Sequence, residues 1–571
     1  MKKPNEYRAL LRSLGKEWRW LFRYVSKYRF EVFLYIIIGI VGTAMGLGSS
    51  VASKHLIDAV VTHNNDTIGL AVSLTIGLAL MQIFLNAATS RITSVVGTRI
   101  KTEIRADIYK HIVLSRWEDI NKFHSGDLIN RLEGDVATVS NSIISFVPSV
   151  FTKLTQFFGC LAIVIYYDAS MVFFALLSAP FLFFASRFTT KMMRKYNEES
   201  REMNGHILSF SEESMQNIQT IKAFDLTRRY IDDFKKLLNE YRKMRMAHDK
   251  FSIVLNMIMS VIGLAVSYLC YGWGVWRLWQ GVITYGTMTL FLQISGKLSA
   301  SFSALVSLVP GAIAIGTAAG RIMKITDLSL EEDTDKAVAQ DIMPSAIKNG
   351  ITVRATDLTY TYDDSTQAVL NNIDFVAHPG ETIALVGPSG EGKTTILRLI
   401  LGLVEPDSGK IEMAVNGTSL NISDSTRRFC SYVPQGSAIF SGTVADNLRI
   451  VKPEATDEEL EAVLKIADAW GFVSELPEVL NTNIGERGVN FSEGQIQRIS
   501  IARAILRDAP VLIMDEATSA LDADTEARVL KNIMECDKNR TCIITTHRPS
   551  MLQYCQRIYR LNEKGNLISD K

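Results

Sequence analysis

The sequence has few of the features that identify a disulfide-linked or nucleic-acid-binding protein. It contains only six cysteines in 571 residues and no C-x-x-C pair, so a disulfide framework is not expected and the thiols are predicted to be free. The net charge is +1 because acidic and basic residues nearly cancel, which gives no reason to expect nucleic acid as a partner. The distribution of charge and hydrophobicity along the chain is therefore the more informative signal.

A cleavable leader is also not indicated. Residues 1–30 are basic and amphipathic and carry Trp18 and Trp20, but they lack a short apolar core that ends at a small-residue cleavage site. We expect a retained helix here that lies in the membrane interface as an elbow before the first span. No N-terminal peptidase-like extension with Cys and His is recognised, so combined cleavage and export of a precursor peptide is not expected.

Long apolar stretches are present in the first half of the chain. Hydrophobic residues make up 47% of the sequence and charged residues 21%, and the length predicts at least two domains, one of them in lipid. A spanning helix needs about 20 residues to cross about 30 Å of hydrocarbon. Six stretches meet this requirement, at 32–53, 67–90, 142–166, 170–187, 251–276 and 284–315. Residues 31–324 are therefore predicted to form an α-helical six-helix transmembrane domain.

The connections between these spans differ in charge. Residues 61–67 and 166–170 are short and carry no Lys or Arg, whereas 91–138 and 187–250 are long and rich in both. The positive-inside bias predicts that both termini and the long connections lie in the cytoplasm.

The long connections contain no proline, so we expect the membrane helices to continue through them into the cytoplasm. Turn-like patches interrupt them at 116–127 and 211–220, and these patches are candidate docking points for the domain that follows. Residues 325–349 are acidic, contain Pro344 and show no clear period, which predicts a linker. From 350 to 571 the pattern of strand, turn and helix indicates a soluble α/β domain.

The stretch 381–400 predicts a phosphate-binding loop between a strand and a helix. Its glycines let backbone N–H groups wrap the β- and γ-phosphates, and the helix N-terminus adds a favourable field. Lys393 supplies a positive charge, and the Thr394 hydroxyl is a candidate Mg²⁺ ligand. The strand, loop and helix context makes a chance match rare.

A second stretch, 509–522, supplies the carboxylates that such a site needs. An apolar strand ends at Asp515, which predicts a buried carboxylate for Mg²⁺. Glu516 follows directly and is placed to orient and deprotonate a water that attacks the γ-phosphate. An acidic pair after a strand is often a solvated edge, but together with the phosphate loop it indicates an NTPase.

Five motifs in this order resemble the nucleotide-binding domain of ABC transporters. They are the phosphate loop, YVPQG with Gln435, FSEGQIQR at 491–498, VLIMDEATSALD, and TTHR with His547. The segment 481–488 and the six preceding helices resemble the exporter branch, in which membrane and ATPase halves are fused in one chain. The implied fold is a six-helix transmembrane domain followed by an α/β P-loop NTPase domain, and the implied ligands are ATP and Mg²⁺.

The resemblance also implies roles for individual residues. Glu516 would act as base, His547 would contact the γ-phosphate, and Gln435 would reach Mg²⁺ and the attacking water. Adenine would stack on Tyr362, with Tyr360 as the alternative. The implied nucleotide contacts are Tyr362, Gly387, Pro388, Ser389, Gly390, Glu391, Gly392, Lys393, Thr394, Thr395, Ser492, Gly494 and Gln495, and the implied metal ligands are Thr394, Gln435 and Asp515. Residues 519–522 would form a loop that crosses to a partner.

The stretch 491–495 departs from the family's usual Leu-Ser-Gly-Gly-Gln at Phe491 and Glu493. Ser492 and Gln495 fit the spacing of a capping box, so Glu493 is predicted to be the first residue of a helix with its side chain turned away from phosphate. In this family this stretch is called the signature, and it completes the ATP site of the opposite subunit. The chain holds one copy of each motif, so a dimer is expected, either a homodimer or a heterodimer with a degenerate partner.

The resemblance implies ATP-driven export of a peptide, drug-like molecule or lipid across the cytoplasmic membrane by alternating access. An importer of the same architecture, an ATP-gated channel or cargo-free regulatory ATPase, and a membrane-tethered P-loop enzyme are the alternatives. Charges within spans are costly, so Lys153 and Lys297 are expected to face a cavity or neighbouring helices. Lys297, with Gln293 and Ser301, is a candidate contact for anionic cargo or, equally, a structural hydrogen-bond donor between helices.

Overall fold

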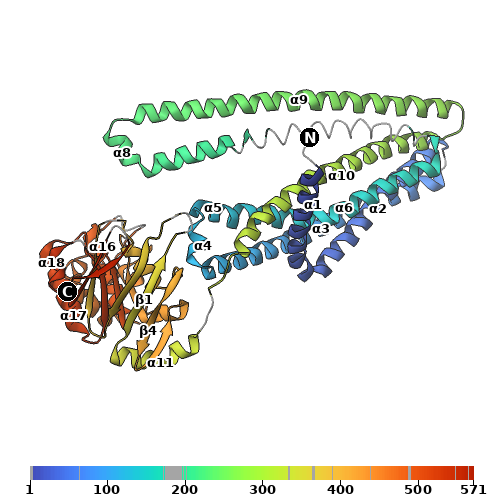
Figure 1. Ribbon diagram of the computed structural model, residues 1–571. Helices are drawn as coiled ribbons and strands as arrows, with labels where there is room; N and C mark the ends of the chain where they lie inside the picture. The colour runs from blue at the N-terminus through green and yellow to red at the C-terminus, as the bar shows by residue number, and fades with distance from the viewer. Residues whose placement is uncertain are drawn as a thin grey trace. The chain divides into compact units, whose positions relative to one another are not determined.

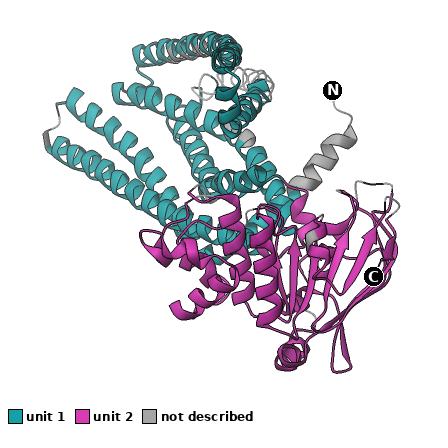
Figure 2. Cartoon of the chain, turned by 90° about the vertical axis from the view of Figure 1, so that its left-hand side faces the viewer, with its two compact units in different colours: residues 1–112, 124–327 teal, residues 113–123, 328–571 magenta. Residues whose placement is uncertain are grey.

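The computed structural model describes residues 4–63, 65–170, 173, 196, 199–200, 202–331, 335–362, 365, 367–388, 390–436, 439–485, 490–546, 548–562 and 565–570. The chain divides into two compact units (Figure 2). Unit 1 comprises residues 1–112 and 124–327, and unit 2 comprises residues 113–123 and 328–571. The short segment 113–123 therefore belongs to unit 2, although unit 1 precedes and follows it in the sequence.

The described part of unit 1 is helical (Figure 1). Its elements are α1 (Pro4–Lys27), α2 (Arg29–Val61), α3 (Asn65–Leu114, with its last two residues in unit 2), α5 (Ser125–Asn130), the π-helical turn η1 (Arg131–Asp135), α6 (Val136–Tyr167), α8 (Ile218–Ala223), α9 (Thr227–Trp279) and α10 (Tyr285–Thr326). Five of the six predicted spans correspond to α2, α3, α6, α9 and α10, the last predicted to begin one residue before α10 does. The fourth, 170–187, lies almost entirely outside the described residues.

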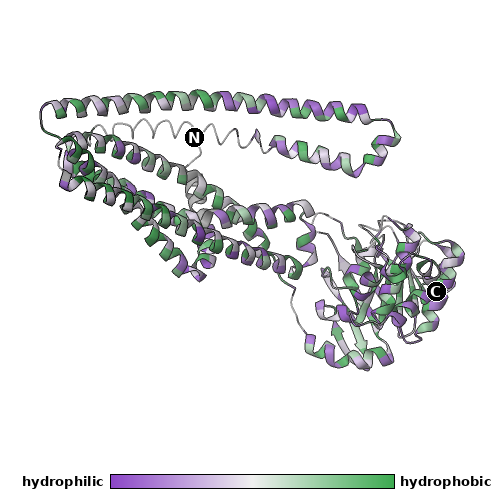
Figure 3. Ribbon diagram, turned by 180° about the vertical axis from the view of Figure 1, so that it is seen from behind, coloured by the Kyte–Doolittle hydropathy of each residue, from purple (hydrophilic) through white to green (hydrophobic). Residues whose placement is uncertain are grey.

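Hydrophobic residues make up much of the long helices of unit 1 (Figure 3). Leu70 and Phe84 on α3 are 70% and 71% exposed, and α2 and α9 also carry many exposed apolar residues. Such a surface suits lipid because it would be costly in water. Among the described residues, the stretches Arg29–Val61, Asp66–Leu114 and Ser125–Tyr167 are long and apolar enough to span a membrane.

A cluster of buried apolar residues joins α1 to the long helices. Leu21 and Val25 of α1 pack with Ile104 of α3 and Ile322 of α10. The N-terminal segment is thus helical, as predicted, and one of its faces is covered by unit 1.

Unit 2 contains two β-sheets. The first has strand order β2-β1-β4-β5 and is antiparallel; the second has order β10-β9-β3-β8-β7-β6 and is mostly parallel. The strands are β1 (Thr352–Tyr360), β2 (Leu370–Ala377), β3 (Thr382–Val386), β4 (Ser408–Val415), β5 (Thr418–Asn421), β6 (Cys430–Val433), β7 (Val511–Asp515), β8 (Thr541–Thr545), β9 (Arg557–Leu561) and β10 (Leu567–Ser569). Strands β3, β7 and β8 are buried along their whole length, as apolar runs of a covered parallel sheet should be.

Helices surround these sheets. They are α4 (Trp117–Asn121), α11 (Lys336–Asn349), α12 (Lys393–Ile400), α13 (Val444–Arg449), α14 (Asp457–Ile466), α15 (Trp470–Ser474), α16 (Glu493–Leu506), α17 (Ala523–Cys536) and α18 (Pro549–Leu552), with the 3-10 turns η2 (Asp424–Phe429) and η3 (Val479–Asn481). The segment 325–349, predicted as a linker, is largely helical because it contains α11. Ala339 and Ala346 of α11 are fully buried, and Pro344 lies within the helix.

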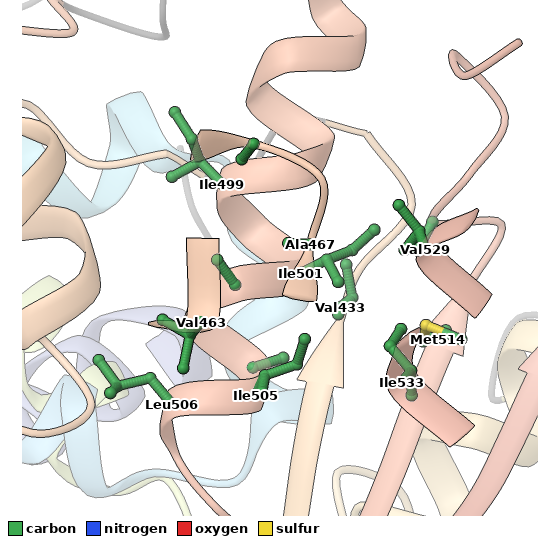
Figure 4. Close-up of a cluster of buried hydrophobic side chains, with 14 of the residues drawn as sticks. Val433, Val463, Ala467, Ile499, Ile501, Ile505, Leu506, Met514, Val529 and Ile533 are labelled. Carbon is green, nitrogen blue, oxygen red and sulfur yellow. The ribbon is translucent and has the colours of Figure 1, made fainter. Parts of the chain in front are cut away.

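One core of unit 2 lies between the parallel sheet and its helices (Figure 4). Val433 and Met514 from the strands meet Ile501 and Ile505 of α16, together with Val529 of α17. This packing fixes α16, which carries the signature motif, against the strands that end in the candidate site.

Candidate active site

The phosphate loop lies where β3 ends and α12 begins. Gly387, Gly390 and Gly392 all have positive φ, and Gly392 at φ +102° precedes the first residue of α12. A Cβ atom on Gly392 would come within 2.8 Å of a Val369 methyl group, so both conformation and space require glycine. Ser389, predicted to contact nucleotide, lies outside the described residues.

Lys393 folds over this loop. Its ammonium group donates to the carbonyl oxygens of Gly387 at 2.6 Å and Pro388 at 2.7 Å, and only 6% of the residue is exposed. Burial lowers the pKa of Lys393, while the nearby carboxylates of Glu516, Glu391 and Asp515 act in the opposite direction. The predicted cation and the predicted acidic pair are therefore neighbours in space.

The acidic pair lies at the end of β7. Asp515 is 2% exposed; its Oδ1 accepts from the Thr545 hydroxyl at 2.7 Å, and its Oδ2 has no hydrogen-bond partner among the described residues. The Gln435 amide donates to Glu516 Oε2 at 2.8 Å. Because β3, β8, β7 and β6 are parallel neighbours, the residues that follow them meet at one sheet edge. His547, the remaining predicted catalytic residue, lies outside the described residues.

The oxygen atoms at this edge fit a divalent cation. A buried carboxylate oxygen without a partner is costly unless something else satisfies it, and Asp515 Oδ2 is such an atom. Mg²⁺ prefers carboxylate, hydroxyl and amide oxygens, the types that Asp515, Thr394 and Gln435 provide. The donor set is thus compatible with the predicted metal.

The two candidate tyrosines differ in their surroundings. Tyr360 is 3% exposed and its hydroxyl donates to Glu118 at 2.7 Å, so its ring belongs to the interior of unit 2. Tyr362 is half-buried, and its hydroxyl lies 3.0 Å from that of Thr395 at the start of α12. Of the two, Tyr362 is therefore the one near the phosphate loop with a partly accessible ring.

The signature stretch forms the beginning of α16. The predicted capping box is confirmed: the Ser492 hydroxyl accepts from Gln495 N–H at 3.3 Å, and the Gln495 side-chain oxygen accepts from Ser492 N–H at 2.9 Å. Glu493 is the first helical residue, as predicted, and is exposed. The Phe491 ring packs against that of Phe472 with centroids 6.3 Å apart, so Phe491 is an apolar anchor for this stretch.

The loop 519–522 is held from two sides. Gln497 of α16 donates to the Ser519 hydroxyl and accepts from Ala520 N–H, both at 3.0 Å. The Arg548 guanidinium donates to the carbonyl oxygens of Ser519 and Leu521, both at 2.7 Å. Neither Gln497 nor Arg548 was predicted as a site residue. The available signal for Gln497 is a polar side chain on the buried side of an apolar helix.

Part of the first turn-like patch packs within unit 2. Besides the bond between Glu118 and Tyr360, the Arg398 guanidinium stacks over the Trp117 ring at 4.8 Å. Arg116 donates to Glu405 at 3.1 Å. The segment 113–123 thus contacts the domain that carries the phosphate loop, while docking of 211–220 stays a prediction.

The two lysines within predicted spans lie in unit 1. Lys297 donates to the Gly46 carbonyl oxygen and to the Ser50 hydroxyl, both at 2.7 Å, and so connects α10 to α2. Ser301 is fully buried and donates to the Leu298 carbonyl oxygen. Lys153 donates to Gln156 on its own helix at 3.3 Å. These contacts favour the structural alternative for Lys297 over a contact with cargo.

The parallel sheet carries a phosphate loop and, at the end of a neighbouring strand, an acidic pair. Long apolar helices precede it in the chain. Together these features define a membrane-bound P-loop nucleotide hydrolase. Comparisons with known families agree: residues 32–302 match the ABC transporter transmembrane region, and residues 370–519 match the ABC transporter family. The chain belongs to the ABC transporters, with membrane and ATPase regions fused. It is accordingly an ATP-hydrolysing membrane transporter.

Individual relatives cover nearly the whole chain. Two proteins of Staphylococcus aureus, from strains bovine RF122 / ET3-1 and NCTC 8325 / PS 47, are each 27% identical over 96% of this chain and 95% of their own length. Both carry the name "Putative multidrug export ATP-binding/permease protein". A solved structure of a bacterial Atm1-family ABC exporter with ATP bound shares the fold, with a TM-score of 0.79 at 22% identity over 94% of each chain.

Proposed function

We propose that this chain is one half of a dimeric exporter that uses ATP to move amphipathic drug-like molecules, peptides or lipids out of the cytoplasm. The names of the Staphylococcus aureus relatives support export of drug-like molecules, and the apolar surface of unit 1 supports a membrane location. We propose a homodimer because the phosphate loop, Asp515 and Glu516 are all present in one chain. A heterodimer would need a second gene product.

The observation that carries this proposal is the contact between Glu516 and Gln435 beside the buried Asp515. Glu516 would accept a proton from the attacking water, and Gln435 would hold the Glu516 carboxylate in place. Lys393 and the backbone of the phosphate loop would bind the phosphates, and Tyr362 would stack on adenine. His547 would contact the γ-phosphate.

Asp515, Thr394 and Gln435 would hold Mg²⁺. When bound, Mg²⁺ neutralises charge on the phosphates during transfer. Ser492 and Gly494 of one chain would complete the phosphate site of its partner, so that ATP joins the two ATPase domains. The segments 113–123 and 211–220 would pass this closure to the membrane helices, and hydrolysis would reset an alternating-access cycle.

ATP-dependent uptake into inside-out membrane vesicles tests this function. The vesicles would be screened with fluorescent dyes, peptides and lipids, and we expect uptake of at least one class only when ATP is present. Glu516→Gln should abolish uptake, whereas Glu535→Gln on the exposed end of α17 should leave it intact. Equal uptake by wild type and Glu516→Gln would contradict the proposal, and uptake only into right-side-out vesicles would indicate import.

A further inference from the structure

Thr545 occupies the end of β8 next to the acidic pair. It is the direct neighbour of Asp515 across the parallel strands β7 and β8, and it is 2% exposed. Its hydroxyl donates to Asp515 Oδ1 at 2.7 Å and accepts from the backbone N–H of Glu516 at 2.9 Å. One buried hydroxyl therefore connects the proposed metal ligand to the proposed base.

The direction of these two bonds is fixed by chemistry. An ionised carboxylate only accepts hydrogen bonds, and a backbone N–H only donates them. The single proton of the Thr545 hydroxyl must therefore point at Asp515. The lone pairs of the hydroxyl oxygen then accept from the backbone N–H of Glu516. Asp515 Oδ1 is thereby occupied, while Oδ2 has no partner among the described residues and is the oxygen available to a cation.

The backbone of Glu516 gives this contact a second consequence. Glu516 has φ +48°, in the left-handed region that residues with a side chain rarely adopt. Such a conformation persists only when neighbouring groups hold it, and the bond from Glu516 N–H to Thr545 is one of them. In this conformation the Glu516 carboxylate accepts from the Gln435 amide at 2.8 Å.

We propose that Thr545 is a positioning residue that sets both the free oxygen of Asp515 and the orientation of Glu516. This inference rests on the proposed function, because it assumes that Asp515 binds the metal and that Glu516 is the base. Thr545 itself touches neither phosphate nor water in this role. A residue that orients a metal ligand typically changes metal affinity or activity by about 10–100-fold when it is replaced.

The test replaces Thr545 with Val, which keeps the shape of the side chain and removes the hydroxyl. We expect kcat for ATP hydrolysis to fall by about tenfold or more, with little change in KM for ATP because the phosphate loop is untouched. Thr545→Ser keeps the hydroxyl and should restore most of the activity. If Thr545→Val is not recovered in folded form, Thr545→Ala serves as the variant without a hydroxyl, and its kcat is compared with that of Thr545→Ser.

Thr541 at the other end of β8 offers a matched control. It is fully buried, and its hydroxyl donates to the Ile351 carbonyl oxygen at 2.6 Å, away from the site. Thr541→Val should lower Tm through the lost hydrogen bond and leave kcat unchanged. If Thr541→Val lowers kcat as much as Thr545→Val does, the effect is one of stability and the inference is overturned.

Metal binding gives a readout that does not depend on hydrolysis. In a Glu516→Gln background with ATP present, Mn²⁺ binding followed by electron paramagnetic resonance should weaken about tenfold on Thr545→Val. Unchanged Mn²⁺ affinity together with unchanged kcat would overturn the positioning role of Thr545. Full hydrolytic activity of Glu516→Gln would instead show that the proposed base is wrong, which separates the two failures.

Discussion

At the scale of single residues, Glu493 is compatible with an active signature because it begins a helix. Its side chain is exposed at the first position of α16, where a carboxylate gains about 0.3–1 kcal/mol from the helix dipole. Glu493→Gly should therefore change ATPase activity by no more than a few-fold. Steady-state ATP hydrolysis by the purified transporter measures this.

The neighbours of Glu493 should respond differently. A Cβ atom on Gly494 would come within 2.9 Å of the Ala520 carbonyl oxygen, so Gly494→Asp would displace the loop 519–522. Ser492→Ala would remove the cap, at a cost of about 1 kcal/mol, together with the hydroxyl proposed to face a phosphate. Both should lower activity far more than Glu493→Gly does. Equal tolerance of all three changes would show that this stretch is not part of an ATP site.

Glu391 gives a second prediction at this scale. Its Oε2 is buried without a hydrogen-bond partner among the described residues and lies 3.2 Å from where a Cβ atom on Gly387 would stand. A carboxylate about 8 Å from a phosphate repels it by roughly 2 kcal/mol per unit charge at an effective dielectric of 20. Glu391→Gln should therefore bind ATP more tightly, as measured by titration with a fluorescent ATP analogue.

The control for Glu391 is Glu535→Gln, which removes the same charge from the exposed end of α17. Its ATP affinity should equal that of wild type. The gain with Glu391→Gln should also persist at high salt, because a buried charge is poorly screened. Unchanged or weaker ATP binding by Glu391→Gln would mean that this carboxylate does not oppose the phosphates.

At the scale of elements, the first residue of α10 is set by a contact that the sequence did not reveal. Asp58 of α2 accepts from Gly286 N–H at 2.8 Å and from the Thr284 hydroxyl at 2.9 Å, and it pairs with Lys54 at 3.2 Å. A Cβ atom on Gly286 would come within 2.3 Å of the Lys54 carbonyl oxygen, so the two helices are in close contact.

Asp58→Ala should destabilise the transporter by about 1–3 kcal/mol because it leaves donors of α10 unsatisfied. Asp66→Ala is the matched control, since Asp66 is an exposed acidic residue in the first turn of α3 and should contribute only about 0.3–1 kcal/mol. Thermal unfolding in detergent compares the two variants. Equal shifts in Tm would indicate that the contacts of Asp58 add nothing beyond the helix dipole.

The sequence predicted elements well where the signal is local. Hydropathy indicated the helices α2, α3, α6, α9 and α10, and strand, glycine and helix spacing indicated the phosphate loop and α12. The capping box at Ser492 was also local, since its partners are three residues apart. The helix α11 was missed because its apolar period is weak and Pro344 lies inside it.

Contacts between distant segments were not predictable in this way. Thr545 reaches Asp515 only because β8 lies beside β7 in the parallel sheet, thirty residues away in sequence. The family resemblance favoured Tyr362 over Tyr360 for adenine stacking, but the contact between Tyr360 and Glu118, a residue more than two hundred positions earlier in the chain, could not be predicted from the sequence. Such contacts depend on tertiary packing and produce no periodic pattern in the sequence.

At the scale of the whole molecule, the proposed dimer makes a prediction about where each ATP site is assembled. If Ser492 completes the ATP site of the partner, each site combines the phosphate loop of one chain with the signature stretch of the other. A phosphate-loop defect in one chain and a signature defect in the other chain then damage the same site. Lys393→Ala supplies the first defect. Ser492→Asp supplies the second, because Asp retains the helix cap but places a negative charge toward the phosphates.

The experiment uses Glu516→Gln in both chains to prevent hydrolysis and two affinity tags to isolate mixed dimers. Dimers without further changes should retain two ATP molecules, and dimers with either defect in both chains should retain none. A mixed dimer has both defects in one shared site and an intact second site, so it should retain one. Sites built within single chains would instead leave the mixed dimer with none, since each chain would then carry its own defect. Counting retained nucleotide per dimer therefore decides whether the signature acts on its own chain or on its neighbour.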